Sequence, residues 1–551
     1  MKTIIITSLQ QLESYRSNWT EILEENENDN PFIEYGWITT WWRYLSGDNQ
    51  LFIIGVQHEN EMIAFVPFMK KKGLLLERIY FIGYGQANYM DMIVSDKWKE
   101  TVIRFVLEEL LEERGNIIFH LHGLLTSKGT DNLLIQFLSE KGVPFHLSKV
   151  VSPFANTNEI EMEKYLKKRL KKDSLARKEK RLKKLGKVTF STLTADQCDA
   201  MFKLHQKRWK NKMDTSGFSK GPTKEFFEEL VSLKHEAFQT HIHALFFEGR
   251  LIAFDYGLQC RGRHVFYMPA HDDDFGAFSP GKIILKELIR SCVENNISIV
   301  DLSIGFEPYK YDWNTHIDYA YRITFSGSNY YAKAAYEFLK LKEIFVSYLK
   351  KYRSIVLFKR NTLGRWLNYF RKQDKKKAWS VFHKNVANIR KFLFERTTCY
   401  VYKQSIHQKQ QESNVNPYKL ISAIDLMNDD DSRKDLEKLI RRLYLQNDGF
   451  CQERKSFWVD YKVIRLHAGI EEQLPKNSAY VYDCDLYEST MAGAVLARNH
   501  QIEHIYITDF NKNKTLLQKG FKLKKAFVIT TIAGRKFIKE TRYEKGKEQK
   551  G

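Results

Sequence analysis

The stretch of sequence that decides the fold runs from residue 264 to residue 313 and reads HVFYMPAHDDDFGAFSPGKIILKELIRSCVENNISIVDLSIGFEPYKYDW. Its pattern predicts a strand, a polar loop, a helix that begins at Ser279-Pro280-Gly281, a second strand, and a loop that reaches Trp313. A strand followed by a crossover helix and a neighbouring strand is typical of mixed α/β (α+β) architecture. We therefore expect mixed sheets covered by helices.

The start of this helix is the first candidate for chemistry. Ser279 precedes a proline at the first helical position, and Gly281 lets a ligand approach the backbone. Unpaired amides at a helix N-terminus attract phosphate or carboxylate. The sequence therefore predicts an anion or cofactor site at Ser279, Gly281 and Lys282.

A weak internal duplication surrounds the same stretch. An acidic turn and the strand Met62-Ile-Ala-Phe65 are matched by a second turn and Leu251-Ile-Ala-Phe254. Each is followed by a strand, a helix and a further strand, which end at Gly123 and Gly305. Phe254 follows Phe65 by 189 residues and Gly305 follows Gly123 by 182, so the two offsets nearly agree. The sequence predicts two halves with one topology.

At 551 residues the chain is too long for one ordinary core, since domains average about 100 to 200 residues. We expect five segments, which are an N-terminal half (1–160), a basic helical connector (161–187), a second half with the active site (188–328), a basic helical segment and linker (329–416), and a C-terminal α/β domain (417–551).

The chain is strongly basic, with 88 Lys and Arg against 67 Asp and Glu and a net charge of +21. Residues 164–187 alone hold thirteen basic and two acidic residues. This run is either a solvated helix face or an anion-binding strip for nucleic acid, anionic lipid or acidic polysaccharide. Residues 329–396 predict basic, aromatic-rich helix, which either packs on the domain or lies on an anionic membrane.

Six cysteines lie far apart with no CxxC pair and no Cys/His cluster, so the sequence predicts no disulfide scaffold and no metal site. The apolar run at the N-terminus is too short for a signal peptide and predicts a first strand. No window approaches the roughly 20 apolar residues of a membrane span. We expect a cytoplasmic protein, with peripheral contact at the inner face of the membrane as the alternative.

The closing motif carries a family resemblance. A strand that ends in Asp301, followed by Gly305, Glu307, Tyr309-Lys310 and Trp313, resembles the end of the BioF2-like acetyltransferase domain of CelD-type proteins. Further similarities are Asp273, Phe275 and Ser279-Pro280-Gly281, the start Pro31-Phe32 with Trp37, Trp41 and Trp42, Leu182 to Gly186, and His205 with Arg208-Trp209. The resemblance covers about residues 1 to 330.

This resemblance implies two tandem GCN5-related N-acetyltransferase (GNAT) folds, related to the Fem-type transferases. It also implies acyl transfer from acyl-CoA, with acetyl-CoA as the first candidate, to an amine on a cell-envelope or exopolysaccharide precursor. Aminoacyl-tRNA is the alternative donor, because the usual GNAT pyrophosphate loop is absent and Phe278 to Gly281 stand in its place. The Asn511 to Phe521 ending of the C-terminal domain resembles the same fold.

Direct acyl transfer needs an oriented amine and donors for the developing oxyanion, but no nucleophilic side chain. No cysteine has an evident histidine partner, which fits this chemistry. We expect Lys310 to hold a carrier phosphate or stabilise the oxyanion, Tyr309 to donate a hydrogen bond, and Glu307 and Asp273 to act as general bases. A solvated lysine and a packed tyrosine are the alternative interpretations of Lys310 and Tyr309.

The N-terminal half has no counterpart of the Tyr309-Lys310 motif, so we expect it to be structural or to bind the acceptor. A different class of function is also open, namely an inactive scaffold that binds an anionic polymer or a membrane through the basic helices. A nucleic-acid regulator is disfavoured, because no helix-turn-helix, zinc-finger or RNP motif occurs.

Overall fold

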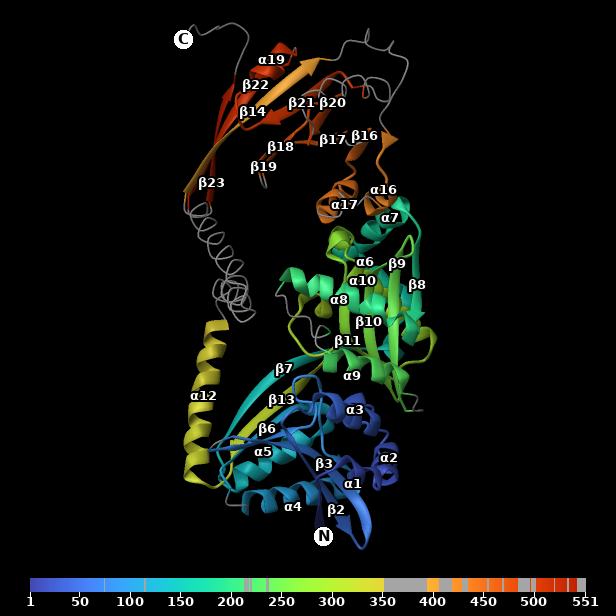
Figure 1. Cartoon of the computed structure of the whole chain (residues 1–551), viewed down its shortest axis with the longest axis vertical. Coiled ribbons are helices and arrows are strands. Elements are labelled where there is room, and N and C mark those ends of the chain that lie inside the picture. Colours follow the sequence, from blue (N-terminus) through green and yellow to red (C-terminus); the bar gives the residue numbers. More distant parts are fainter. Residues whose placement is uncertain are drawn as a thin grey trace. The chain divides into compact units, whose positions relative to one another are not determined.

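The computed structural model consists of two compact units, each with a large mixed sheet (Figure 1). The first comprises Met1–Arg177, Val188–Asp272 and Ser279–Lys359, and the second comprises Lys178–Lys187, Asp273–Phe278 and Arg360–Gly551. The α/β fold class is confirmed. The structure describes residues 1–73, 75–112, 115–212, 218, 221–233, 237–350, 394–405, 419–428, 435–452, 455–467, 470–483, 496, 502–519, 521–532 and 535–542.

The sheet of the first unit has the order β1-β2-β3-β4-β6-β13-β7-β12-β11-β10-β9-β8, with β5 paired to β3. Its strands are β1 (Lys2–Ile6), β2 (Gln50–His58), β3 (Glu61–Lys72), β4 (Glu77–Phe81), β5 (Ile93–Val94), β6 (Ile117–Leu125), β7 (Phe145–Asn156), β8 (Val188–Leu193), β9 (Phe238–Phe247), β10 (Arg250–Cys260), β11 (Arg263–His271), β12 (Ile299–Asp301) and β13 (His316–Ser326). The predicted N-terminal strand is confirmed as β1.

The helices that carry the first part of the chain are α1 (Leu9–Glu13), α2 (Arg16–Glu25), α3 (Tyr35–Leu45), α4 (Lys99–Glu112), α5 (Thr130–Glu140), α6 (Met162–Asp173), α7 (Leu175–Leu185), α8 (Cys198–Lys212), α9 (Gly221–Ser232), α10 (Pro280–Glu294), α11 (Pro308–Trp313) and α12 (Tyr330–Lys350). The apolar stripe of α10 is buried through Ile284, Leu285, Leu288 and Ile289. The basic run 164–187 forms two helices, because Ser174 adopts a left-handed conformation between them.

The predicted duplication is visible in the strand order. β1, β2, β3, β4 and β6 of one half correspond to β8, β9, β10, β11 and β12 of the other. In both halves the pair at the end of this series, β4 with β6 and β11 with β12, is parallel. The hairpins β2–β3 and β9–β10 both turn on two residues with positive φ, Glu59-Asn60 and Glu248-Gly249, which suits a tight two-residue turn.

The two halves exchange their last strands, which the sequence did not predict. β7, from the first half, pairs with β12 of the second, with Asn156 opposite Ile299. β13, from the second half, pairs with β6 of the first, with Phe325 opposite Phe119. β7 and β13 also pair with each other. Each half therefore completes the sheet of the other.

A shared aromatic core joins the halves beneath this sheet. The Phe32 ring contacts Trp37, Tyr89 and Tyr267, with centroids 5.2 to 5.9 Å apart. Trp37 in turn meets Phe226 edge to face at 5.8 Å, and α3 packs on α9. The aromatic start of the chain, which the sequence analysis noted only as a resemblance, is therefore a packing element between the two halves.

Helix α12 lies against β13 and β6 (Figure 1). It exposes Phe338, Leu341, Ile344 and Phe345. Among the described helices, none combines the length and the apolar character that crossing a bilayer requires. The rest of the basic helical segment predicted for residues 351–393 lies outside the described residues.

The sheet of the second unit has the order β15-β16-β17-β20-β21-β14-β22-β23, and β18 pairs with β19. Its elements are β14 (Phe394–Ser405), β15 (Lys419–Leu420), α16 (Ala423–Asn428), α17 (Leu436–Tyr444), β16 (Asp448–Gln452), β17 (Lys455–Asp460), β18 (Val463–His467), β19 (Ile470–Gln473), β20 (Ser478–Tyr482), β21 (His504–Asp509), α19 (Lys514–Gln518), β22 (Lys522–Ile532) and β23 (Arg535–Arg542).

Strand β14 corrects the sequence analysis, which extended basic helix to about Arg396 and placed the C-terminal domain after residue 416. β14 lies between β21 and β22 and so belongs to the C-terminal sheet. Its sequence FERTTCYVYKQS is rich in β-branched and aromatic residues, which favour a strand. The α/β character expected for the C-terminal domain is present, with β20, β21 and β22 in its sheet and the helices α16, α17 and α19 between strands.

The strand exchange predicts how the chain responds to being split between residues 160 and 161. We expect fragment 1–160 alone to be insoluble or to lack a cooperative thermal transition, because β13 is missing between β6 and β7. Co-expressed fragments 1–160 and 161–551 should copurify as one folded complex. Circular dichroism melting and size-exclusion chromatography provide the measurement, and a soluble 1–160 monomer with a sharp transition would contradict the exchange.

Candidate functional site

The candidate site begins where the parallel strands β11 and β12 stop pairing. Their register covers three positions, from Arg263 opposite Ile299 to Val265 opposite Asp301. Beyond this point the Ser303 hydroxyl donates to the Phe266 carbonyl at 2.8 Å. Ser303 has a left-handed φ of 63°, which turns the chain away from the sheet. β11 therefore continues to His271 without β12 beside it.

The start of α10 differs from the sequence prediction. Ser279 is left-handed, with φ 59°, and its side chain makes no capping hydrogen bond to the helix. The amides of Lys282 and Ile283 already donate to the Ser279 carbonyl, at 2.9 and 3.2 Å. Fewer amides are thus open to an anion than a free N-terminus would offer. A Cβ atom on Gly281 would lie 3.0 Å from His271 Nδ1, so glycine gives the helix a close approach to β11.

Several cationic side chains gather beside this helix start. The Arg208 guanidinium, on α8, bonds the His271 ring and also donates to the His271 carbonyl at 3.4 Å. The neighbouring Asp272 carboxylate is 2% exposed and accepts from Lys207 at 2.7 Å and from Arg250. Lys207 and Arg250 therefore meet at the Asp272 carboxylate, next to the histidine that Arg208 contacts. In the sequence, Arg208 stands out only as part of the family resemblance, and His271 was not among the predicted site residues.

Lys310 lies in the short helix α11, not in a loop as predicted. Its ammonium donates to the carbonyls of Ser303 and Ile304, at 3.2 and 2.7 Å, and pairs with the Glu307 carboxylate at 3.0 Å. The side chain is 5% exposed. Burial lowers the pKa of Lys310, while Glu307 opposes this shift. A solvated lysine is therefore excluded, and Lys310 fixes the chain between β12 and α11.

Glu307 and Tyr309, the other two predicted site residues of this segment, differ in their surroundings. The Glu307 carboxylate is 55% exposed. Tyr309 is half-buried, and burial followed by the Glu307 charge raises its pKa, so its hydroxyl stays protonated at neutral pH. Gly305 has a φ of 131°, and a Cβ atom there would lie 2.4 Å from the Glu307 carboxylate, so this turn requires glycine.

The structure brings six of the seven predicted site residues into the first unit. The Lys282 ammonium lies 3.4 Å from the Asp312 carboxylate, which links the start of α10 to α11 and hence to Glu307, Tyr309 and Lys310. Asp273 belongs to the short segment Asp273–Phe278 of the second unit. The catalytic and binding roles of all seven stay predictions.

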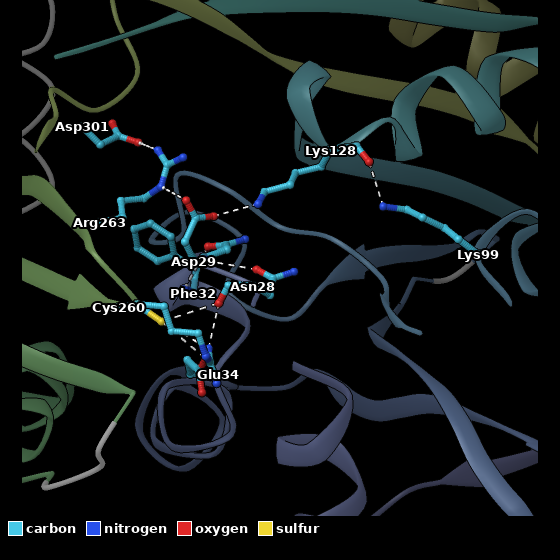
Figure 2. Close-up of polar contacts among 11 residues, drawn as sticks. Asn28, Asp29, Phe32, Glu34, Lys99, Lys128, Cys260, Arg263 and Asp301 are labelled. Atoms are coloured by element: carbon cyan, nitrogen blue, oxygen red, sulfur yellow. Dashed lines mark hydrogen bonds and ion pairs between the residues drawn. The ribbon is translucent and has the colours of Figure 1, made fainter. Parts of the chain in front are cut away.

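A network of buried polar side chains surrounds Asp301, the residue after which the Lys310 segment leaves the sheet (Figure 2). The Asp301 carboxylate, fully buried, accepts from Arg263 at 2.7 Å, from the Tyr89 hydroxyl at 2.7 Å and from the Ser303 amide at 2.7 Å. Arg263 also donates to Asp29 at 2.8 Å. Burial opposes the charge on Arg263, but Asp301 and Asp29 outweigh it and raise the arginine pKa.

The network continues into the first half. Burial favours a protonated Asp29, but Arg263 and Lys128 outweigh it and lower the pKa of this carboxyl. Lys128 contacts Asp29 at 2.7 Å, and its carbonyl accepts from Lys99 at 2.7 Å (Figure 2). The charges therefore alternate from Asp301 through Arg263 and Asp29 to Lys128, and they connect β12 of one half to α4 of the other.

A cavity of about 680 Å³ opens at the end of β4 and β6, the counterparts of β11 and β12. Its polar lining includes Gln86, Asn88, His122, Arg322 and Glu343. Both ring nitrogens of the buried His122 have no protein partner. Burial, with a smaller effect of Arg322, lowers the pKa of His122 to about 3, so the ring is neutral at pH 7. The cavity size suits a small-molecule ligand.

The cavity and the Lys310 segment share a wall. Ile304, whose carbonyl accepts from Lys310, lines the cavity. Asn88, also in the lining, donates to the Ser303 hydroxyl at 3.0 Å. The Tyr267 hydroxyl donates to the Gln86 carbonyl at 2.8 Å. Elements of the two halves therefore meet between the cavity and the end of β11.

Comparisons with known proteins agree with this reading of the fold. Residues 169–311 match the model of the acetyltransferase (GNAT) domain family. A search of curated proteins gave no match. The GNAT-type acyltransferase fold expected from the sequence is thus supported for the segment that contains α10, β12 and most of α11.

Three solved structures are similar to this chain. The structure of FemX has 11% identity and a TM-score of 0.41, covering 58% of this chain and 97% of its own. A domain from Agrobacterium fabrum, assigned to a lysylphosphatidylglycerol synthetase, has 12% identity and a TM-score of 0.37, covering 59% and 94%. A tandem GNAT protein of the clavulanic acid pathway has 8% identity and a TM-score of 0.34, covering 60% and 99%.

The substitution Asp301→Asn tests the buried network. It leaves Arg263 with Asp29 as its remaining carboxylate and turns an amide toward a guanidinium, so we expect the free energy of unfolding to fall by about 3 kcal/mol. Denaturant titration followed by tryptophan fluorescence gives the measurement. Glu140→Gln is the control, because the Arg104–Glu140 pair is exposed and should matter little. Equal stability of both variants would refute the central role of Asp301.

Proposed function

We propose that this protein is an N-acyltransferase that moves an acyl group from acyl-CoA, with acetyl-CoA as the first candidate, to an amine on a cell-envelope or exopolysaccharide precursor. The match of residues 169–311 to the acetyltransferase domain carries the reaction class. Within that class the motif from Asp301 to Trp313 supports the BioF2-like, CelD-type subgroup. The proposed location is the cytoplasm, with peripheral contact at an anionic membrane.

The proposed reaction is direct attack. The neutral amine nitrogen forms a bond to the thioester carbon, the carbonyl oxygen carries the negative charge of the tetrahedral intermediate, and the C–S bond then breaks. The proton lost by the amine balances the thiolate that leaves as a thiol. A cysteine nucleophile is disfavoured among the described buried thiols, because burial raises the pKa of Cys198 to about 11 and of Cys292 to about 12.

The donor is proposed to lie along β11, with its phosphates at the start of α10. Beyond Val265 the edge of β11 no longer faces β12, and an extended arm can bind such an edge through main-chain groups. Ser279, Gly281 and Lys282 border this position, and Arg208 adds a positive charge beside it. Because two amides of the helix start are already bonded, side-chain cations supply much of the attraction for phosphate.

Lys310 is proposed as a positioning residue, since its ammonium is committed to two carbonyls and Glu307. It holds Ser303 and Ile304 between the donor position and the cavity. The protonated Tyr309 hydroxyl is proposed to donate to the oxyanion or to the leaving sulfur. The exposed Glu307 is proposed as the base that takes the amine proton, and Asp273 stays an alternative for that role.

The cavity of the first half is proposed to bind the acceptor. A sugar offers hydroxyl groups as donors and acceptors, and Gln86, Asn88, Arg322 and Glu343 supply complementary partners in the lining. The neutral His122 ring can accept a hydrogen bond from the amine without repelling it. This assigns acceptor binding to the half that lacks the Tyr309-Lys310 motif, one of the two roles expected from the sequence.

Aminoacyl-tRNA is the second donor candidate, and exposed Lys180, Lys183 and Lys184 of α7 are the residues that support it. An inactive scaffold is the third reading. One thermal-shift series with CoA compounds and aminoacyl-tRNA separates the three, because the first two predict different stabilising ligands and the scaffold predicts stabilisation by neither.

Thermal-shift titration with acetyl-CoA, longer acyl-CoAs and free CoA tests the donor. A ligand at roughly 100 times its Kd adds about 2.7 kcal/mol to the folded state, so the Tm should rise by several degrees. Arg208→Gln should reduce this shift, whereas Arg290→Gln, an exposed position near the C-terminal end of α10 and away from its start, should not. Stabilisation by aminoacyl-tRNA alone would select the second candidate, and stabilisation by neither would favour the scaffold.

His122→Asn tests the acceptor cavity. Loss of one hydrogen bond to the amine should raise the KM for an amino-sugar acceptor by about fivefold, because such a bond contributes about 1 kcal/mol. Release of free CoA thiol from acetyl-CoA is the readout, and the Tm shift given by CoA should not change. His58→Asn is the control, because the His58 ring packs at a tilt against Trp98 and does not line the cavity. An unchanged KM would refute acceptor binding at His122.

A further inference from the structure

Three neighbouring strands bring two histidines and an aspartate together inside the second half. His243 on β9 lies directly opposite Asp255 on β10 in the strand register. His264 on β11 lies with its Nε2 atom 3.0 Å from the Asp255 Oδ2 atom. One ligand atom from each of the three residues lies within 4.8 Å of the other two. We call His243, Asp255 and His264 the strand triad.

The strand triad is buried and its polar groups are poorly satisfied. Asp255 and His264 have no exposed surface, and His243 is 7% exposed. The Nδ1 atoms of both histidines and the Oδ1 atom of Asp255 have no hydrogen-bond partner in the protein. Buried polar side chains almost always have partners, so the unpaired His243 Nδ1 and Asp255 Oδ1 atoms mark a candidate ligand site. The unpaired Nδ1 atom of His264 lies on the other side of its ring from the Nε2 atom that faces Asp255.

We propose that the strand triad binds one divalent transition-metal ion, with Zn²⁺ or Fe²⁺ as the best-suited ions. Two imidazoles and one carboxylate form a donor set that such ions prefer. Ca²⁺ and Mg²⁺ prefer an all-oxygen shell, so the two nitrogen donors disfavour them. Because the site is closed to solvent, the ion's role is structural: it joins β9, β10 and β11.

The spacing of the triad agrees with coordination. Two adjacent ligands on one ion, each at about 2.1 Å, lie roughly 3 Å apart. This is the separation of His264 Nε2 and Asp255 Oδ2, so the same pair can be held by a hydrogen bond without the ion and by the ion when it is bound. The remaining separations are at most 4.8 Å, so the third ligand atom would have to move inward when the ion binds.

The chemical character of the triad is also suited to binding. Neutral imidazole and carboxylate are the forms that bind a divalent ion, and an ion beside the Asp255 carboxylate would offset the cost of burying its charge.

Gly257 shows that the strands make room for the triad. A Cβ atom there would lie 2.3 Å from the His264 ring and 2.9 Å from the Asp255 Oδ2 atom. Its φ is not in the left-handed region, so space, and not backbone conformation, requires the glycine. Cys292 of α10 lies within electrostatic range of Asp255, but burial keeps its thiol protonated, and it falls outside the group of ligand atoms.

The sequence predicts no metal site, because the three ligands are not closely spaced along the chain. His243, Asp255 and His264 are 12 and 9 residues apart, and only the register of three strands places them together. A signal is present in the sequence: three consecutive strands each carry one His or Asp, and Gly257 lies on the middle strand.

Metal analysis of the untagged full chain tests the proposal. We expect about one equivalent of Zn²⁺ or Fe²⁺ per chain after exposure to the ion, anaerobically for Fe²⁺, followed by gel filtration. Asp255→Asn and His264→Asn should each weaken binding by more than about 100-fold, beyond the loss typical for outer-shell partners. His241→Asn is the matched control, since His241 lies two residues from His243 on β9 but outside the triad, and it should keep the ion.

Two further measurements keep the test decisive if a variant fails to fold. Co²⁺ added to the wild-type protein should give the visible absorption of a site with nitrogen and oxygen ligands. Chelator dialysis should lower the Tm, and Zn²⁺ should restore it. A wild-type protein that takes up none of these ions, a folded His264→Asn variant that keeps one equivalent, or loss of the ion in folded His241→Asn would each overturn the proposal.

Discussion

The carboxylate of Asp301 is the constraint on which the candidate site depends. A fully buried charge is tolerated only when donors surround it, and here the donors come from Arg263, Tyr89 and the Ser303 amide. These groups belong to separate segments of both halves, so satisfying one carboxylate fixes their mutual positions. The segment that carries Lys310 leaves the sheet directly after Asp301. The position at which this segment begins is therefore fixed.

The duplicated halves have different surroundings at equivalent positions. At the end of β11 and β12 the structure places charged side chains and the start of a long helix, whereas at the end of β4 and β6 it places a cavity with an unpaired histidine. Lys310 connects the two, because it bonds the carbonyl of a residue that lines the cavity. A donor and an acceptor brought to these two places would approach each other across Ile304.

The local elements could be predicted from the sequence, since periodicity and turn residues determine them. The strand-helix-strand order around α10 and the repeat between Phe65 and Phe254 followed from such patterns. The exchange of β7 and β13 could not, because strand order depends on pairing between residues more than 150 positions apart, such as Asn156 and Thr315. Lys310 was found by its motif, but its buried partners were not, and the strand triad is invisible without the sheet register. β14 was missed although its β-branched and aromatic residues favour a strand.

The exchanged strands also limit how the molecule can admit its substrates. β13 is hydrogen-bonded on one side to β6 and on the other to β7, which continues to β12, so no flexible linker separates the two halves. A hinge motion between them would have to break ladder hydrogen bonds along several residues. Access must instead come from peripheral elements such as α12, whose Glu343 and Ile344 line the cavity. The sheet itself therefore remains a fixed frame, and α12 is a part of the cavity wall that is not bound into it.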